Sequence, residues 1–167
     1  EDGAAVNAFD GNTSTIWHTK YAGGSPAHPH DIRIALGDTY QLDGFRYLPR
    51  QDGGDNGRIK QYAFYVSNDG SSWGAPVATG TFADNASEQA SLFAVPVSGA
   101  YVRLMALSAY DGDPWTSVAE IRLLGDQAPG GGPNVAPTAA FTYSCTKLAC
   151  NFTDASSDSD GNVRSWS

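Results

Sequence analysis

The sequence is poor in basic residues and contains no long apolar run. Its 167 residues include 10 Lys and Arg against 18 Asp and Glu, which gives a formal net charge of −8. A surface of this sign repels phosphate backbones, so we expect no nucleic-acid partner. No apolar stretch approaches the roughly 20 residues that a membrane-spanning helix needs, so we expect no membrane partner either.

The sequence also lacks an initiating Met, a signal peptide and all but two cysteines. We therefore expect a mature or excised fragment of a longer chain. Cys145 and Cys150 lie close together near the C-terminal end, and a disulfide between them is the interpretation we favour. A disulfide predicts an oxidising compartment and hence a secreted, extracellular protein. Free thiols or half of a metal site are the alternatives, although no second Cys or His pair lies nearby.

Glycine and proline are abundant by contrast, with 19 Gly and 9 Pro, and they favour short strands and turns over long helices. Apolar residues alternate with period two in several segments: Ile32, Ile34 and Leu36; Phe45 and Tyr47; Tyr62, Phe64 and Val66; Val102, Leu104 and Ala106; Ile121 and Leu123. This pattern is typical of antiparallel sheets packed face to face. We predict an all-β sandwich over residues 1–125, in which residues 4–9 form one helical turn before the first strand.

A change of composition follows this first unit. Residues 126–136 are rich in Gly and Pro and are predicted to form a linker. Residues 137–167 are predicted to begin a second β-domain, with strands at 138–144 and 150–153, a turn at 158–162 and too little chain to complete a sandwich.

The loop at residues 9–15, FDGNTST, concentrates oxygen atoms around a glycine. Asp10 and Thr15 can supply side-chain oxygens, and Phe9 and Asn12 can supply carbonyl oxygens, which together suit a hard cation such as Ca²⁺. Glu120, in an otherwise apolar terminal strand, can add a second carboxylate. The alternative is an Asx turn capped by Asp10, with Glu120 solvated at a sheet edge.

Three further predicted loops carry polar and aromatic side chains. A sugar site needs an aromatic ring against the apolar face of the pyranose, and planar donors and amides for its hydroxyls. His18, Arg50 and Asn56 can supply the polar groups, and Tyr21 or Trp115 can supply the ring. The alternatives are that His18 is a surface or packing residue and that Arg50 only pairs with Asp52 or Asp55.

Several ordered motifs resemble the discoidin or coagulation factor 5/8 type C family and, within it, carbohydrate-binding module family 32. They are NAFDGNTSTIWH at 7–18, PHDIRIALG at 29–37, FRYLPR at 45–50, YVSNDGSSW at 65–73, YVRL at 101–104 and AEI at 119–121. The resemblance covers nearly all of residues 1–125. It implies a jelly-roll sandwich with a structural calcium ion, whose usual ligand positions correspond to Phe9, Asp10, Asn12, Thr15 and Glu120.

The resemblance also extends to galactose-binding members of this family. Their sugar-contacting positions correspond to Glu1, His18, Tyr21, Arg50 and Asn56, with Trp115 in a loop that often carries a second aromatic. Tyr21 departs from the commoner Trp. The implied ligands are terminal galactose and N-acetylgalactosamine, because imidazole and guanidinium can form hydrogen bonds with an axial hydroxyl that glucose lacks.

The C-terminal segment resembles the beginning of a polycystic-kidney-disease (PKD) domain, through APTAAF at 136–141 and FTDASSDSDG at 152–161. We interpret the chain as a non-catalytic, glycan-binding piece of a larger secreted hydrolase, to whose catalytic domain it is covalently linked. A discoidin-type protein or matrix adhesion module, or a module for another polysaccharide, is the alternative. A small hydrolase is disfavoured, since no nucleophile motif or spare carboxylate pair is present.

Overall fold

A computed structural model describes residues 3–127, 138–146 and 149–157 of the chain. The chain divides into two compact units, Glu1–Gln127 and Ala128–Ser167. Among the residues that the structure describes, no helix has the length and apolar character that crossing a membrane requires.

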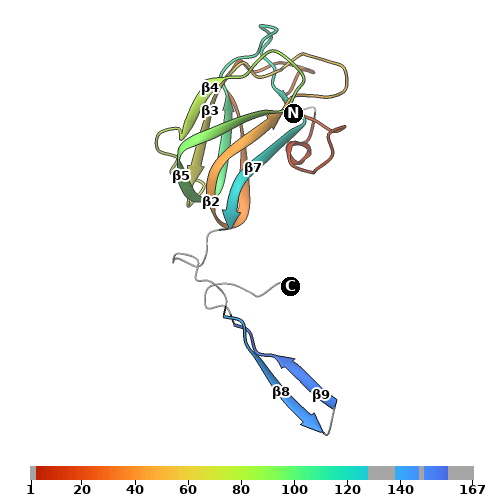
Figure 1. The fold of residues 1–167 in the computed structure, drawn as a ribbon. Helices are drawn as coiled ribbons and strands as arrows, with labels where there is room; N and C mark the ends of the chain where they lie inside the picture. Colours follow the sequence, from red (N-terminus) through yellow and green to blue (C-terminus); the bar gives the residue numbers. More distant parts are fainter. Residues whose placement is uncertain (1–2, 128–137, 147–148, 158–167) are drawn as a thin grey trace. The chain divides into compact units, whose positions relative to one another are not determined.

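The regular secondary structure of the first unit consists of antiparallel strands and one short 3₁₀ turn (Figure 1). After a 3₁₀ turn, η1, at Ala5–Ala8, the strands are β1 (Trp17–His18), β2 (His30–Leu48), β3 (Gln61–Ser67), β4 (Ala78–Thr81), β5 (Gln89–Ala106), β6 (Ser117–Val118) and β7 (Glu120–Gln127). Five of them form one sheet in the order β4-β3-β5-β2-β7, and β1 pairs with β6 in a second, small sheet. The predicted all-β sandwich is confirmed, and the predicted helical turn is η1.

Strands β2 and β5 are long because they curve around the core instead of ending (Figure 1). The ladder between them shifts register between Ala35 and Tyr40 and again between Leu42 and Gly44. Such irregularities bend a strand and increase its local twist. A Cβ at Gly44 would lie 2.4 Å from the carbonyl oxygen of Ser91, so the second shift depends on the absence of a side chain there.

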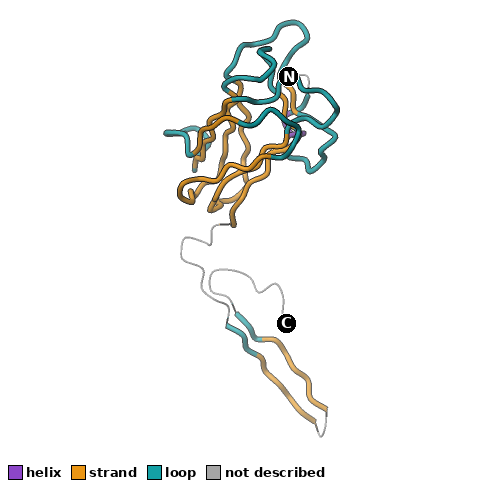
Figure 2. The backbone as a smooth tube through the Cα atoms, turned by 45° about the horizontal axis from the view of Figure 1, so that its top comes forward, coloured by secondary structure: helices purple, strands orange, loops and turns teal. Residues whose placement is uncertain are grey.

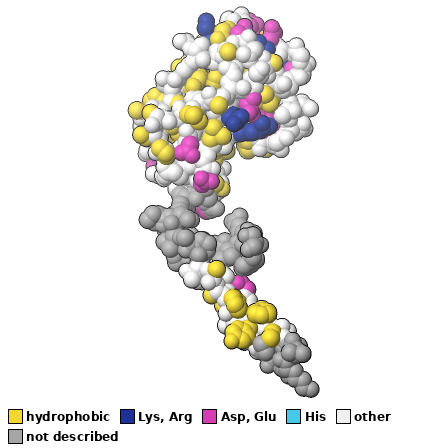
Figure 3. All heavy atoms as spheres, viewed as in Figure 1, with side chains coloured by type: hydrophobic (Ala, Val, Ile, Leu, Met, Phe, Trp, Pro, Cys, Tyr) yellow, Lys and Arg dark blue, Asp and Glu magenta, His cyan; other side chains and the backbone are white. Residues whose placement is uncertain are grey.

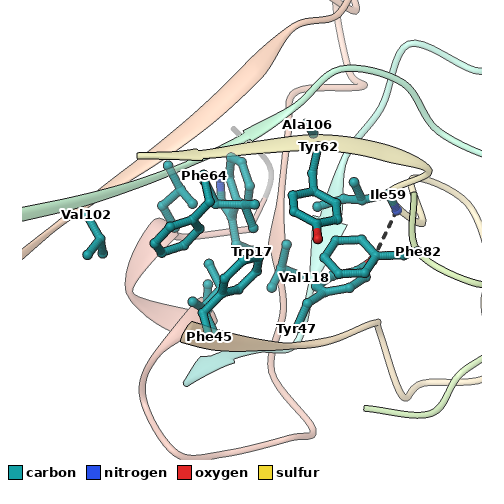
Figure 4. Packing of buried hydrophobic residues seen from close by; sticks show 14 of the residues in the cluster. Trp17, Phe45, Tyr47, Ile59, Tyr62, Phe64, Phe82, Val102, Ala106 and Val118 are labelled. Carbon is teal, nitrogen blue, oxygen red and sulfur yellow. Dashed lines mark hydrogen bonds between the residues drawn. The ribbon is translucent and has the colours of Figure 1, made fainter. Parts of the chain in front are cut away.

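The core lies between the curved sheet and the β1–β6 pair, and it is rich in aromatic rings (Figure 4). Phe45 stacks on Phe64 with centroids 4.1 Å apart, and Tyr62 stacks on Phe82 at 4.2 Å. The residues predicted to alternate into the core are buried or packed against it, as expected. Tyr47 is fully buried, and its hydroxyl accepts a hydrogen bond from the Ile59 amide at 3.1 Å, which satisfies both polar groups.

The loops after β1, β2 and β5 gather at one end of this unit (Figure 2). This end carries the predicted sugar-contacting residues that the structure describes. The sheet therefore acts as a rigid support, and the loops present the functional groups.

The second unit contains a hairpin of β8 (Phe141–Thr146) and β9 (Ala149–Asp154). Its register sets Cys145 opposite Cys150, and Cys150 is disulfide-bonded. Phe141, Tyr143 and Phe152 are each more than 60% exposed, and Figure 3 shows apolar side chains on this hairpin. An isolated two-stranded hairpin with exposed aromatic side chains is marginal in water, so the described residues of this unit do not by themselves form a packed core.

The predicted linker and the turn at 158–162 fall largely outside the described residues. The first two residues assigned to the linker, Asp126 and Gln127, belong to β7, where Gln127 pairs with Tyr40. The first unit therefore extends two residues beyond the predicted boundary.

Candidate sugar-binding pocket

The loop end of the first unit contains a polar and aromatic hollow of about 290 Å³. It is lined by Gly3, Ile16, His18, Tyr21, Arg50, Asn56 and Trp115. These residues come from the N-terminal segment, the end of β1 and the residue before it, the β1–β2 loop, the β2–β3 loop and the β5–β6 loop, which the fold brings to one place. A volume of this size is suited to a single monosaccharide rather than to an extended chain.

The orientation of the His18 ring is fixed by the backbone of the next residue. The residue is only 5% exposed, and its Nδ1 lies 2.6 Å from the carbonyl oxygen of Thr19. A carbonyl oxygen only accepts, so Nδ1 carries the proton. In the neutral imidazole Nε2 is then an acceptor, and within the described part of the chain it has no partner. A sugar hydroxyl can donate to it.

Three rings surround one side of the hollow. Tyr21 meets the imidazole of His18 edge to face, with centroids 5.2 Å apart, and lies 6.5 Å from Trp115. Tyr21 is 56% exposed, so its ring offers an open apolar face. The orientation of the Trp115 ring is fixed by the hydrogen bond that its Nε1 donates to Oγ of Ser25 at 2.8 Å. These rings can cover the C–H face of a pyranose.

A hydrogen-bonded group lies behind Trp115 and supports its loop. The neighbouring Thr116 is fully buried, and its hydroxyl lies 3.1 Å from Nε2 of His28 and 2.9 Å from Nδ1 of His30. The Thr116 amide also donates to Oγ1 of Thr19 at 2.9 Å. The loops that carry Tyr21 and Trp115 are thereby tied together.

Arg50 is oriented by two partners on its own loop. Its Nε and Nη2 donate to the two carboxylate oxygens of Asp52 at 2.7 and 2.6 Å, and Nη1 donates to Oδ1 of Asn56. The Arg50 hydrogen bonds lower the pKa of Asp52 to about 2, and the same bonds raise the pKa of Arg50. Since Oδ1 of Asn56 accepts from Arg50, its Nδ2 remains as a donor for a ligand.

Two glycines allow this loop to close around Arg50. A Cβ at Gly54 would lie 2.8 Å from Nε of Arg50, and one at Gly57 would lie 2.8 Å from the amide nitrogen of Ser117. Gly57 also has a φ of +77°, which side-chain-bearing residues rarely adopt. Its amide donates to Oδ2 of Asp111 at 2.8 Å, which links the β2–β3 loop to the β5–β6 loop.

The structure brings together five of the six residues predicted to contact sugar: His18, Tyr21, Arg50, Asn56 and Trp115. Glu1 lies outside the described residues. The predicted alternative for Arg50, an ion pair with Asp52, is also present, so pairing and pocket lining coexist. Sequence reasoning missed Gly3 and Ile16, whose backbone and apolar side chain carry no functional signature, and it missed Ser25 behind Trp115.

The oxygen-rich loop after η1, at residues 9–15, is stabilised by hydrogen bonds among its own residues. The Asn12 amide donates to Oδ1 of Asp10 at 2.8 Å, and Oγ1 of Thr15 lies 2.8 Å from both Oδ2 of Asp10 and the carbonyl oxygen of Asn12. Gly11 has a φ of +78°, as the tight turn requires. Phe9, which precedes the turn, is 41% exposed. The predicted Asx turn at Asp10 is therefore present.

Glu120 lies beside this loop and is only 2% exposed, so the prediction that it is solvated at a sheet edge is wrong. Although β7 is an edge strand, this side chain points inward. Within the described chain its Oε1 has no hydrogen-bond partner. Burial raises the pKa of Glu120, and the negative charge of Asp10 raises it further. A buried oxygen without a partner, next to a second carboxylate, is an arrangement that a bound cation would stabilise.

No group of three or more His, Cys, Asp or Glu side chains is assembled for a metal in the described ranges. A cation at this loop would therefore draw on the two carboxylates of Asp10 and Glu120 together with the Thr15 hydroxyl and backbone carbonyls. Such mixed oxygen donors fit Ca²⁺, which tolerates irregular geometry.

The fold and the pocket together define a β-sandwich binding domain, and residues 1–121 match the F5/8 type C domain. The chain belongs to this family. It is 45% identical over 118 residues to a galactose oxidase of Gibberella zeae, covering 70% of this chain and 17% of that enzyme. The chain thus spans less than a fifth of that relative's length.

Two solved structures from Clostridium perfringens resemble the first unit. One is CpGH89CBM32-5 in complex with GalNAc-β-1,3-galactose, with a TM-score of 0.68, 35% identity, and 74% of this chain and 84% of that chain covered. The other is the family 32 carbohydrate-binding module of NanJ in complex with galactose, with a TM-score of 0.65, 30% identity, and 72% and 84% covered. The predicted kinship to carbohydrate-binding module family 32 is confirmed.

Proposed function

We propose that this chain is a non-catalytic carbohydrate-binding module for terminal galactose and N-acetylgalactosamine. The observation that carries the proposal is the single hollow lined by an imidazole, a guanidinium, an amide and two aromatic rings. The similar family 32 modules with bound galactose and GalNAc-β-1,3-galactose support the choice of sugar.

The pocket offers groups of both hydrogen-bonding kinds. Nε2 of His18 accepts, whereas Asn56 Nδ2 and the remaining N–H of Arg50 Nη2 donate. A sugar hydroxyl both donates and accepts, so it can satisfy His18 and one of the donors at once. Tyr21 and Trp115 cover the apolar face of the ring. Glu1 completes the proposed ligand set by resemblance to the family.

The proposal includes a structural calcium ion at the loop after η1. Its ligands are the carbonyl oxygens of Phe9 and Asn12, the hydroxyl of Thr15 and the carboxylates of Asp10 and Glu120. Oε1 of Glu120, which has no hydrogen-bond partner among the described residues, supports this assignment. When bound, the ion neutralises the buried charge and fixes the loop that leads into β1 and His18. Its role is in stability and not in the recognition of sugar.

The module belongs to a larger secreted enzyme, which it holds near glycans. The similarity to less than a fifth of a galactose oxidase supports a modular parent, whereas the predicted class of that parent, a hydrolase, remains a prediction. Residues 126–136 form the proposed linker, although β7 includes the first two. The hairpin of the second unit, with Cys145 opposite a disulfide-bonded Cys150, begins the proposed PKD domain.

Titration of the ¹⁵N-labelled full chain with galactose, N-acetylgalactosamine and glucose tests the proposal. A single shallow site predicts a Kd of about 0.1–1 mM, or roughly −4 to −5.5 kcal/mol, for the first two sugars. The moving amides should lie around the hollow, and glucose should bind more weakly. His18→Ala should abolish binding while the rest of the spectrum is retained. Unmoved amides at tens of millimolar galactose and N-acetylgalactosamine would refute the proposal.

A further inference from the structure

Arginine in a binding pocket usually indicates recognition of an anion. The planar guanidinium matches a carboxylate or sulfate with two parallel N–H donors. In this pocket Asp52 occupies that position, because its two oxygens take Nε and Nη2 of Arg50 at 2.7 and 2.6 Å. The Arg50 side chain is 12% exposed and that of Asp52 is 42% exposed, so Asp52 covers the outer edge of the guanidinium.

Further carboxylates surround this pair. Asp55 lies on the same loop, and its charge raises the pKa of Arg50 in addition to the larger effect of the hydrogen bonds that Arg50 donates to Asp52. Asp111 accepts from the amide of Gly57, next to Asn56 in the pocket wall. Lys20 adds one cation to the β1–β2 loop, where its Nζ would lie 3.9 Å from a Cβ at Gly23. Asp52 therefore neutralises Arg50, and Asp55 and Asp111 place further negative charge on the two loops beside Asn56.

The hydrogen-bonding pattern inside the hollow also disfavours an anion. Nδ1 of His18 donates to the Thr19 carbonyl, so the neutral ring presents an acceptor at Nε2. A carboxylate or sulfate oxygen only accepts, and it would meet the lone pair of Nε2 without a hydrogen. A sugar hydroxyl meets the same atom as a donor.

We propose that the pocket selects uncharged sugar ends and excludes acidic ones, and that Asp52 determines this specificity by holding and neutralising Arg50. The inference rests on the proposed function and deepens it. The chemical class that binds is a neutral hexopyranose, and the class that is rejected is the same ring with a carboxylate, a hexuronate. Asp52 is a positioning residue, since it acts through Arg50.

Three ligands of nearly the same shape separate charge from size: methyl galactoside, methyl galactosiduronate and the methyl ester of that uronate. Isothermal titration of the full chain should show the galactoside and the uncharged ester binding with similar Kd values. The acid should bind at least roughly tenfold more weakly. The difference between ester and acid should shrink as salt rises from about 0.05 M to about 1 M, because ions screen the repulsion.

Asp52→Asn tests the role of the residue, since it removes the charge and keeps the shape. We expect the variant to lose much of its discrimination, so that the ratio of acid to ester Kd falls at least roughly threefold toward unity. Asp84→Asn is the matched control, because Asp84 pairs with Arg58 at 2.6 Å and does not line the hollow. It carries the same change of net charge and should keep the wild-type ratio.

Each outcome distinguishes the inference from the function on which it rests. Binding of the galactoside with equal binding of acid and ester overturns the selectivity and leaves the proposed function intact. If neither the ester nor the acid binds, the exclusion is due to size, and the proposed selectivity by charge is overturned. If the ratio of acid to ester Kd in Asp52→Asn equals that of the wild type, Asp52 does not determine the specificity. If the wild-type chain binds none of the neutral sugars, the proposed function itself is refuted and the inference falls with it.

Discussion

Trp115 donates a hydrogen bond from its Nε1 to Oγ of Ser25 at 2.8 Å, across two loops that are far apart in the sequence. The bond joins the β1–β2 loop, which carries Tyr21, to the β5–β6 loop. The spacing of the aromatic rings in the pocket therefore depends on a residue that does not line it.

Ser25→Ala should weaken galactose binding without unfolding the chain. A net hydrogen bond contributes about 1 kcal/mol, so the affinity should fall roughly threefold to fivefold as Trp115 becomes less well oriented. Titration calorimetry measures the change, and Ser71→Ala, on an exposed loop outside the pocket, is the control. An affinity equal to that of the wild type would show that the bond does not position Trp115.

Tyr21→Ala should lower galactose affinity through the loss of one aromatic face. Aromatic contacts contribute about 0.5–1.5 kcal/mol beyond area burial, which corresponds to roughly a twofold to tenfold increase in Kd. Because Tyr21 is 56% exposed, the melting temperature should change little. Tyr143→Ala, at an exposed position of β8, should leave both quantities unchanged. A large drop in melting temperature would instead show that Tyr21 stabilises the folded domain.

Chelation should destabilise the wild-type chain, and Glu120→Gln should remove that response. An ion bound at about 100 times its Kd stabilises the native state by about 2.7 kcal/mol, which predicts a loss of several degrees in Tm on adding EDTA. In EDTA the variant should melt above the wild type, since it no longer buries an uncompensated carboxylate next to Asp10.

Differential scanning calorimetry with and without calcium measures both effects. Asp43→Asn, at an exposed position of β2, should respond to calcium as the wild type does. Identical melting of the wild type in calcium and in EDTA, with no metal detected by mass spectrometry, would remove the calcium assignment.

The Arg50–Asp52 pair predicts a pH dependence of stability. Arg50 lowers the pKa of Asp52 from its usual 3.8 to about 2, so the folded state binds this proton less readily than the unfolded state. The stabilisation is therefore fully present above pH 4 and is lost as pH falls toward 2. Because Asp52 is 42% exposed, solvent screening limits the effect to about 1 kcal/mol or less.

Urea unfolding of the wild type and of Asp52→Asn between pH 2 and pH 6 isolates this contribution, since the other carboxylates are common to both proteins. The difference in unfolding free energy between them should decrease as the solution becomes more acidic. A difference that stays constant over this range would mean that the pair does not stabilise the fold.

The sheet was predictable because its signal is local. In a strand, side chains alternate between faces, so Phe45 and Tyr47, or Val102 and Leu104, reveal the buried face without any knowledge of their partners. The register shifts in β2 were not predictable, since they depend on which strand lies alongside. The same limit applies to Glu120: it stands on an edge strand, but the loop after η1 covers it, which its own segment does not indicate.

The amino-acid sequence by itself determined the strand-forming segments, the residue types able to contact a sugar and, through ordered motifs, the family. The tertiary structure decided that His18, Arg50 and Trp115 share one hollow and that Asp52 occupies the anion-binding edge of Arg50. It also buried Glu120 with an oxygen that has no partner in the described part of the chain. The physical reason is the separation along the chain over which each interaction acts. Alternation and turn chemistry act over a few residues, whereas hydrogen bonds between loops form only after strands distant in the chain have paired.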